Sequence, residues 1–342
     1  MPRKRISVII PSYNSRLTIK NCIVSVIETR YPDLEIIVVD DRSKDESVQI
    51  VMGLQEQYSG VVRFVRQEQN GGPARARNRG AREARGEYLF FLDSDTVMMP
   101  DALDHFAQKM MEVDAVTGVY DYQSINRNIA ARYKALLNFY FFSRKGVIDY
   151  EVFDASRAGI KKVVFESMGG FNENLAWGMD YENEEFGYRL VKKYRNLLVP
   201  QVRVKHFYPG FRQLTKNYFS RVALWMEIFF TRRKFESGGV TSVGTAISSI
   251  CLLLAIFCLL ASVYSSLFLL FFLIFFGVYI YGYLGFLRFV QQKDSGFWPT
   301  ALACNVYFTA IIASGAGWGA LKSLLGLSKT AQTIKAEGDC EA

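Results

Sequence analysis

Two aspartates separated by one serine follow an apolar stretch in YLFFLDSDTVMMP, residues 88–100. Carboxylates at the end of a buried strand are costly unless a cation or hydrogen bonds compensate their charge. Asp93 and Asp95 can share a hard divalent cation such as Mg²⁺ or Mn²⁺, which takes oxygen ligands and commonly bridges to phosphates. Because Asp-Ser-Asp is also common in turns and helix caps, the triplet alone is weak evidence for a metal site.

The elements that position this pair alternate between strand and helix over residues 1–215. Apolar strands are expected at 6–12, 34–41, 61–67 and 87–95. Helices are expected at 17–30, 43–58 and 71–85, the second capped by Ser43 or Asp45. Such a pattern predicts an α/β fold, Rossmann-like, with a mostly parallel sheet covered by helices on both faces. Ligands of these sheets bind at the carboxyl ends of the strands, where PSYN, DD and DSD all fall.

Composition narrows the class of protein. The chain has 342 residues, half of them hydrophobic, and a formal net charge of +8. Its 5 cysteines have no paired spacing, which argues against a disulfide framework or a zinc site and for a reducing compartment. The basic residues form no single block with interleaved aromatics, so nucleic acid is not an expected partner.

The region after Thr241 is strongly apolar. No charged residue occurs from Thr241 to Leu287, and two membrane-spanning helices are expected at about 243–264 and 266–287, with a tight turn between them. The alternative is a buried helical hairpin in a soluble protein. A third apolar segment, about 297–325, either spans, re-enters or lies in the interface. Because a full crossing would carry Lys322 to the far side, the positive-inside rule favours re-entry or the interface.

Basic flanks give the orientation and complete the predicted domain organisation. Arg232 and Arg233 before the first span and Arg288 after the second place the N-terminal region in the cytoplasm. We therefore predict an integral protein of a bacterial or archaeal inner or plasma membrane. The catalytic domain is expected at 1–215, a juxtamembrane region at 216–240, the transmembrane region at 241–327 and a polar tail at 328–342. Aromatic and basic residues in 216–240 suit a helix in the headgroup layer, or one packed on the catalytic domain.

Four motifs occur in the order of a known family: ISVIIPSYN, IIVVDDRSKDES, NGGPARARNRGAREARGEYLFFLDSD and MGGFNEN…GMDYENEEFGYRL. Over residues 5–210 the chain resembles the inverting family-two glycosyltransferases with a GT-A fold. That resemblance implies a nucleotide-diphosphate sugar as donor, a UDP-sugar favoured, and a divalent cation, Mn²⁺ or Mg²⁺, as cofactor. It also implies that Asp93 and Asp95 bind the metal. His206 is a further candidate ligand, although a lone histidine at a strand end is more often structural.

The same resemblance identifies a nucleotide-sugar pocket. Asp41, with Asp40 beside it, would contact uracil, and Pro11 and Tyr13 would line the pocket. The residues it implies in full are Pro11, Tyr13, Asn14, Asp40, Asp41, Asn70, Gly71, Gly72, Arg75, Arg79, Asp93 and Ser94. Among the arginines after the glycine pair we favour Arg75, but Arg75, Arg79 and Arg82 also fit a solvated helix face.

The catalytic base is where the sequence departs from the family. Relatives carry an aspartate in a Glu-Asp pair at the start of a helix, and here DYENEEFGYRL puts Glu182 and Asn183 at that pair. An asparagine cannot accept a proton at neutral pH, so Glu182, Asp180 and Glu184 are the candidate bases. A phosphate acceptor, already ionised near neutral pH, would tolerate the asparagine. The alternative is that these acidic residues are not catalytic and only stabilise the start of the helix through its macrodipole.

These observations predict a metal-dependent inverting glycosyltransferase that acts on a membrane-lipid acceptor, with polyprenyl phosphate favoured, at the cytoplasmic face. A processive polysaccharide synthase is one alternative, although a Gln-x-x-Arg-Trp motif is not visible. A non-catalytic membrane scaffold that retains the fold is the other. The sequence leaves open the sugar, the nucleotide base and the number of subunits, with a homo-oligomer as one option.

Overall fold

The computed structural model describes residues 4–175, 182–232 and 242–325. The chain forms two compact units. Unit 1 comprises Met1–Ile125 and Phe142–Phe207, and unit 2 comprises Asn126–Phe141 and Tyr208–Ala342.

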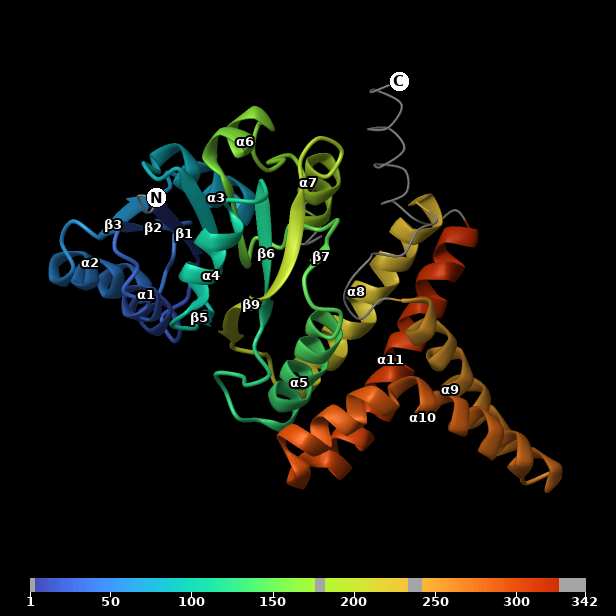
Figure 1. Ribbon diagram of the computed structural model, residues 1–342. Helices are drawn as coiled ribbons and strands as arrows, with labels where there is room; N and C mark the ends of the chain where they lie inside the picture. The colour runs from blue at the N-terminus through green and yellow to red at the C-terminus, as the bar shows by residue number, and fades with distance from the viewer. Residues whose placement is uncertain (1–3, 176–181, 233–241, 326–342) are drawn as a thin grey trace. The chain divides into compact units, whose positions relative to one another are not determined.

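Unit 1 contains, among its described residues, a nine-stranded sheet in the order β3-β2-β1-β4-β8-β6-β9-β5, with β7 paired to β9 (Figure 1). Its first four strands are parallel and match the predicted ones: β1 (Ile6–Ser12), β2 (Leu34–Asp40), β3 (Val62–Arg66) and β4 (Tyr88–Leu92). The other strands are β5 (Thr96–Met98), β6 (Ala115–Tyr120), β7 (Ile148–Asp149), β8 (Arg157–Lys161) and β9 (Asn196–His206). The mixed sheet arises because β8 runs antiparallel to both β4 and β6.

Two hydrophobic cores lie on opposite faces of this sheet. Val8 and Ile10 of β1 point into one core, and Ile9 points into the other, as the alternation along a strand requires. The first core packs α1 (Ile19–Glu28), α2 (Ser47–Gln57) and α4 (Ala102–Lys109). The second packs α3 (Gly72–Glu83), α6 (Lys162–Ser167) and α7 (Glu182–Leu190). Helices on both faces confirm the predicted architecture.

The parallel register brings the polar strand ends to one edge. Ile9 pairs with both Ile37 of β2 and Phe91 of β4, and Ser12 pairs with Asp40. Asp93 follows Phe91 by two residues, so the DSD triplet and the DD pair leave the sheet at the same edge. They are separated by β1, which is about 10 Å for two strand spacings.

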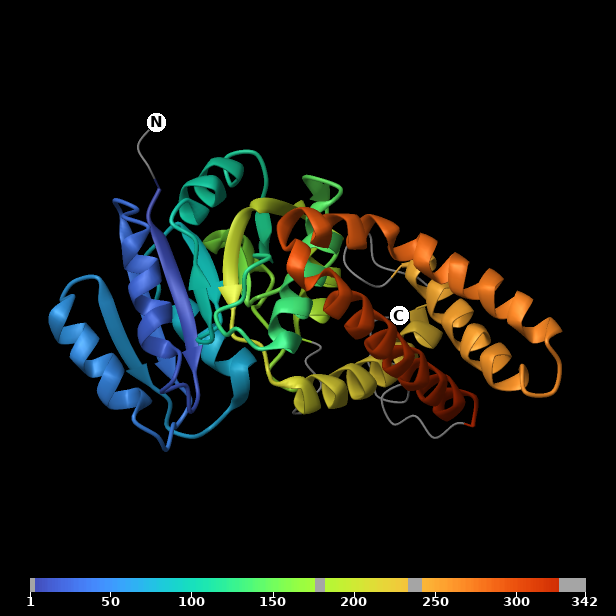
Figure 2. The same ribbon diagram turned by 90° about the horizontal axis from the view of Figure 1, so that it is seen from below.

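Unit 2 is helical. Most of α5 (Ile129–Ser143) belongs to it, together with α8 (Phe211–Arg232), α9 (Val243–Ala261), α10 (Leu267–Lys293) and α11 (Trp298–Leu324). Within this unit α9 and α10 form an antiparallel hairpin, and α11 lies along α8 (Figure 2). Aromatic side chains attach α5: the Tyr133 ring stacks on Phe308 of α11 with centroids 5.3 Å apart. The segment 126–141, which lies within the range predicted for the catalytic domain, therefore packs with the apolar helices.

Three helices of the described chain are long and apolar enough to cross a membrane: Val243–Ala261, Leu267–Lys293 and Ser295–Leu324, which includes a short 3₁₀ turn. The first begins with a capping box between Ser242 and Thr245. α11 runs unbroken over 27 residues, so the third apolar segment does not form a re-entrant hairpin. At a rise of 1.5 Å per residue, the 27 residues of α11 form a helix about 40 Å long.

Candidate active site

The Asp40-Asp41 pair at the end of β2 is buried and organises the turn that precedes α3. Asp41 accepts the Gly71 and Gly72 N–H groups at 2.8 Å each, one on each carboxylate oxygen. Burial raises the pKa of Asp41 above its ordinary value, and the two glycine bonds act against that rise. Asp40 accepts the Ser43 N–H and lies 3.4 Å from the Arg66 guanidinium. The glycine N–H groups that could approach a bound anion thus bind the chain's own carboxylate.

The loop after β1 is fastened to the loop after β2. Asn14, in a left-handed conformation, accepts the Lys44 N–H on Oδ1 at 2.8 Å and donates its own N–H to Ser43 Oγ. The predicted cap of α2 is wrong for both candidates, because the N-cap is Glu46 and makes no side-chain capping bond. Asp45 instead accepts the N–H of Ser47, the first residue of that helix. Tyr13 is half exposed next to this junction, and Pro11 is the second-to-last residue of β1. Both predicted pocket residues thus lie at the carboxyl edge of the sheet.

The arginines of α3 divide into two sets. Arg79 pairs with Glu83 and Arg82 lies 3.9 Å from Glu173, both at exposed positions. Arg75 has no ion pair or hydrogen bond among the described residues, and its side chain covers Gly71, where an added Cβ would lie 2.3 Å from Arg75 Cδ. Asn70 donates its amide to the Asp41 carbonyl at 2.9 Å. Arg75, which has no partner in the described part of the chain, therefore lies over the glycine turn.

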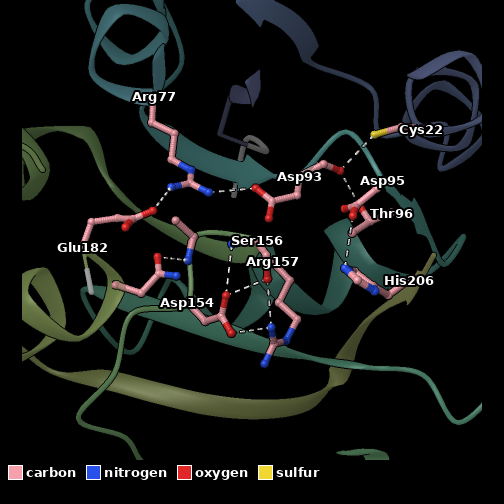
Figure 3. A network of polar contacts seen from close by, with 12 residues as sticks. Cys22, Arg77, Asp93, Asp95, Thr96, Asp154, Ser156, Arg157, Glu182 and His206 are labelled. Atoms are coloured by element: carbon pink, nitrogen blue, oxygen red, sulfur yellow. Dashed lines mark hydrogen bonds and ion pairs between the residues drawn. The ribbon is translucent and has the colours of Figure 1, made fainter. Parts of the chain in front are cut away.

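Arg77 is on the opposite, buried side of α3 and is 4% exposed. Its Nη2 donates to Asp93 Oδ1 at 2.8 Å, and its Nη1 donates to Glu182 Oε1 at 3.0 Å (Figure 3). Burial raises the pKa of Asp93, which Arg77 opposes and the neighbouring charge of Asp95 reinforces. One guanidinium thus joins the first aspartate of the triplet to a candidate base.

Asp95 faces β9. Its Oδ2 lies 3.4 Å from His206 Nε2, and the His206 ring packs against Tyr120 with centroids 4.7 Å apart. Burial raises the pKa of Asp95 to about 6. Asp95 Oδ1 is buried without a hydrogen-bond partner in the described part of the chain. A buried oxygen with no donor suits a hard cation, so the donor chemistry fits Mg²⁺ or Mn²⁺.

The three expected metal ligands do not form a preformed cluster. Within residues 4–175, 182–232 and 242–325, no group of three or more His, Cys, Asp or Glu side chains is placed to hold a metal ion. Asp93 is turned to Arg77, whereas Asp95 is turned to His206. Ser94, between them, is partly exposed.

A second buried ion pair adjoins Asp93. Arg157, 1% exposed, donates Nη1 to Asp154 Oδ2 at 2.5 Å and Nε to the Gly118 carbonyl at 3.0 Å. Ser156 connects this pair to the triplet, because its carbonyl accepts the Asp93 N–H at 3.2 Å. Arg157 and the Ser156 hydroxyl hold the pKa of Asp154 below its usual value although burial opposes them. Asp154 therefore adds a fixed negative charge beside the triplet.

The start of α7 is bound to its surroundings at several residues. Asn183 Oδ1 accepts the Ala155 N–H at 3.0 Å, and Glu185 pairs with Arg189. Glu184 is partly buried in the same turn. Asp180 lies outside the described residues. Asn183, at the position where the family resemblance implies the base, therefore binds the backbone next to Asp154.

Arg77, Asp154 and Arg157 are not among the site residues predicted from the sequence. A signal existed for Arg77: Gly80, Ala81 and Ala84 follow it by three, four and seven residues, so it falls on the apolar face of α3. An arginine on an apolar helix face must find buried acidic partners. No comparable pattern marks Asp154, because its neighbours form an irregular segment.

Comparison with known proteins relates this geometry to a family. Residues 7–167 match the family model described as Glycosyl transferase family 2. The chain is 33% identical over 137 residues to the glycosyltransferase GlyG of Streptococcus pneumoniae serotype 4, which covers 40% of this chain and 43% of GlyG. It is 35% identical over 108 residues to a GalNAc(5)-diNAcBac-PP-undecaprenol beta-1,3-glucosyltransferase of Campylobacter jejuni, which covers 32% of this chain and 35% of that enzyme. The chain thus spans less than half the length of these relatives.

A solved structure shares the fold. The mannosyltransferase PcManGT from Pyrobaculum calidifontis, in complex with GDP-Man and Mn²⁺, superposes with a TM-score of 0.56 over 94% of this chain and 87% of that one, at 18% identity. The matched residues 7–167 contain β1 to β4, the glycine turn, Arg77 and the DSD triplet. Residues 7–167 thus match the model of glycosyltransferase family 2, the fold is GT-A, and three apolar helices follow.

Proposed function

We propose that the protein is a metal-dependent inverting glycosyltransferase. It transfers a sugar from a nucleotide-diphosphate sugar, UDP-linked by resemblance, to a membrane-lipid acceptor at the cytoplasmic face. The observation that carries this proposal is the meeting of Asp40, Asp41, Asp93 and Asp95 at one edge of the sheet of a family 2 domain. PcManGT, which shares the fold, was solved with GDP-Man and Mn²⁺, and this supports a nucleotide sugar and a cation as ligands.

Each strand end has a part in the proposed reaction. Asp93 and Asp95, with His206 beside them, would hold a divalent cation, which when bound supplies positive charge for the leaving diphosphate. Arg75 over the glycine turn adds a cation from the chain itself for the same phosphates. Pro11, Tyr13 and Asn14, together with the fastened loops after β1 and β2, would form the wall against the nucleotide. Asp41 would fix the glycine turn and line the base pocket.

The residues at the start of α7 and the apolar helices favour a lipid phosphate as the acceptor. Asn183 cannot take a proton, so an acceptor that is already ionised needs less help from α7 than a sugar hydroxyl does. Three helices long enough to cross a membrane follow the domain in the same chain. A relative from Campylobacter jejuni is named for an undecaprenol-linked substrate. Polyprenyl phosphate is therefore the acceptor we favour.

A transfer assay tests the proposal. Purified full-length protein is incubated with radiolabelled nucleotide sugars, a lipid extract and Mn²⁺ or Mg²⁺, and then extracted with organic solvent. We expect label in the lipid phase that depends on the cation. Label in insoluble polymer would contradict the proposal and indicate a polysaccharide synthase. Nucleotide binding without transfer to any acceptor would contradict it and indicate a non-catalytic scaffold.

A further inference from the structure

Arg77 connects the end of β4 to the start of α7, where its partner Glu182 lies 105 residues further along the chain than Arg77. Its guanidinium reaches Asp93 after β4 with one Nη and Glu182 at the start of α7 with the other. The guanidinium carbon also lies 5.8 Å from the centre of the Phe171 ring. The side chains of Arg77 and Glu182 are only 4% and 13% exposed, so solvent screens this pair weakly.

The geometry of this contact is specific to arginine. A guanidinium presents a planar fork of donors that binds two carboxylates at once, whereas a lysine ammonium is a compact point charge on a flexible stem. A buried cation that loses one anionic partner is left incompletely compensated, which is costly. The link therefore fixes Glu182 relative to Asp93.

We propose that Arg77 is a positioning residue of the transfer reaction and that Glu182 is the anchored end of its link, not the group that accepts the acceptor's proton. This inference rests on the proposed function. A proton on Glu182 would remove one of the two anionic partners of the buried guanidinium. As an anchor, Glu182 keeps the first turn of α7 in register with the strand end that carries Asp93.

The variant Glu182→Gln separates the two roles. Glutamine has nearly the same shape and keeps an oxygen that can accept the Arg77 Nη1 hydrogen bond, but it cannot act as a base. The lost charge should lower the stability of the protein, whereas the geometry of the link is kept. We expect Glu182→Gln to retain kcat within about tenfold and to keep the wild-type dependence of kcat on pH. Loss of a general base would instead lower kcat by about 10²–10⁴-fold and remove the acidic limb of the pH profile. That result would overturn the inference.

Variants of Arg77 test the link itself. Arg77→Met is expected to lower kcat about a hundredfold with a smaller change in the KM for the donor, since a misplaced catalytic group costs about that much. Arg77→Lys should not restore kcat, because an ammonium does not bridge both carboxylates. Arg82→Met, an exposed arginine on the same helix, is the matched control and should keep wild-type kcat. Rescue by Arg77→Lys would contradict the bridging role.

The double variant Arg77→Met/Glu182→Gln measures whether the two side chains act together. If they form one link, the double variant loses little more than Arg77→Met alone, whereas independent residues would give losses that multiply. Should Arg77→Met not fold, Glu182→Gln alone decides between anchor and base. Wild-type protein without any sugar transfer would refute the proposed function and this inference with it. Active wild type with an inactive Glu182→Gln would refute the inference alone.

Discussion

At the scale of single residues, Asn183 in the first turn of α7 determines whether the site has a proton acceptor at this position. Asn183 Oδ1 accepts the Ala155 N–H at 3.0 Å, and the neighbouring Asp154 carboxylate is fixed by Arg157. The asparagine therefore has a structural partner, which an aspartate could also satisfy. Its presence removes a proton acceptor without removing the hydrogen bond. This fits a reaction whose acceptor is already an anion.

Asn183→Ala should lower the stability of unit 1. The change leaves the part-buried Ala155 N–H without its acceptor, which costs about 1–3 kcal/mol. Thermal unfolding of the detergent-solubilised protein, followed by circular dichroism, measures the change. Asn174→Ala, at an exposed position, is the control and should stay within about 0.5 kcal/mol of wild type. Equal unfolding temperatures for the two variants would show that the Asn183 bond contributes nothing.

At the scale of elements, the glycine turn before α3 brings the donor-side parts together. Gly72 has φ +83°, a left-handed conformation that other residues adopt only with strain, and its N–H donates to Asp41. The turn thus depends both on a glycine and on the carboxylate at the end of β2. Arg75 is carried over the same turn by the first residues of α3.

Gly72→Ala should destabilise the protein by about 1–2 kcal/mol, because a Cβ in the left-handed region is strained. Gly53→Ala provides the contrast: this glycine lies inside α2 with no atom within 4 Å of an added Cβ. It should raise stability by up to about 1 kcal/mol through helix propensity. Chemical denaturation of both variants tests the pair. A Gly72→Ala protein as stable as wild type would mean that the turn has another conformation.

The contact between α8 and α11 depends on small residues. An added Cβ at Gly319 would lie 2.2 Å from the Ala223 carbonyl oxygen, and one at Gly315 would lie 2.5 Å from that of Phe219. Glycines four apart let two helices approach closely. Gly317, between them, has nothing within 4 Å of an added Cβ.

Gly319→Leu should therefore separate α8 from α11, and this overpacking should lower the free energy of unfolding by about 1–3 kcal/mol. The unfolding temperature in detergent should fall accordingly. Gly317→Leu, on the open side of the same helix, should leave the unfolding temperature nearly unchanged. Light-scattering or fluorescence thermal scans on both variants measure the difference. The close contact would be refuted by a Gly319→Leu protein that unfolds together with Gly317→Leu.

The elements differ in how well the sequence predicts them, for physical reasons. β1 to β4 are continuous apolar runs bounded by polar turns, and the sequence places their ends within three residues. β5 and β7 have only three and two residues, and β8 (RAGIK) carries two charges, so no periodicity marks them. The sequence also predicts that the carboxylates lie at one edge, but not Arg77, whose role depends on contacts with residues far along the chain. α5 packs with the apolar helices through aromatic contacts that no local pattern reveals.

At the scale of the whole molecule, a domain that matches the family 2 model is followed, in the described part of the chain, by three helices long and apolar enough to cross a membrane. The basic residues around the first two helices support our proposal that the domain acts in the cytoplasm. A catalytic domain tethered in this way would meet lipid acceptors at a high effective concentration. The proposed chemistry nevertheless depends on the carboxyl edge of the sheet, where one buried oxygen of Asp95 has no donor among the described residues.

The most direct test of this account is calorimetric titration of a uridine diphosphate into the full-length protein with and without Mn²⁺, for wild type and for Asp95→Asn. Asp33→Asn, an exposed aspartate at the other end of β2, serves as control. We predict that wild type and Asp33→Asn bind the nucleotide with Mn²⁺ at least about a hundredfold more tightly than without it, whereas folded Asp95→Asn loses this dependence. Cation-dependent binding of equal strength in Asp95→Asn would contradict the account.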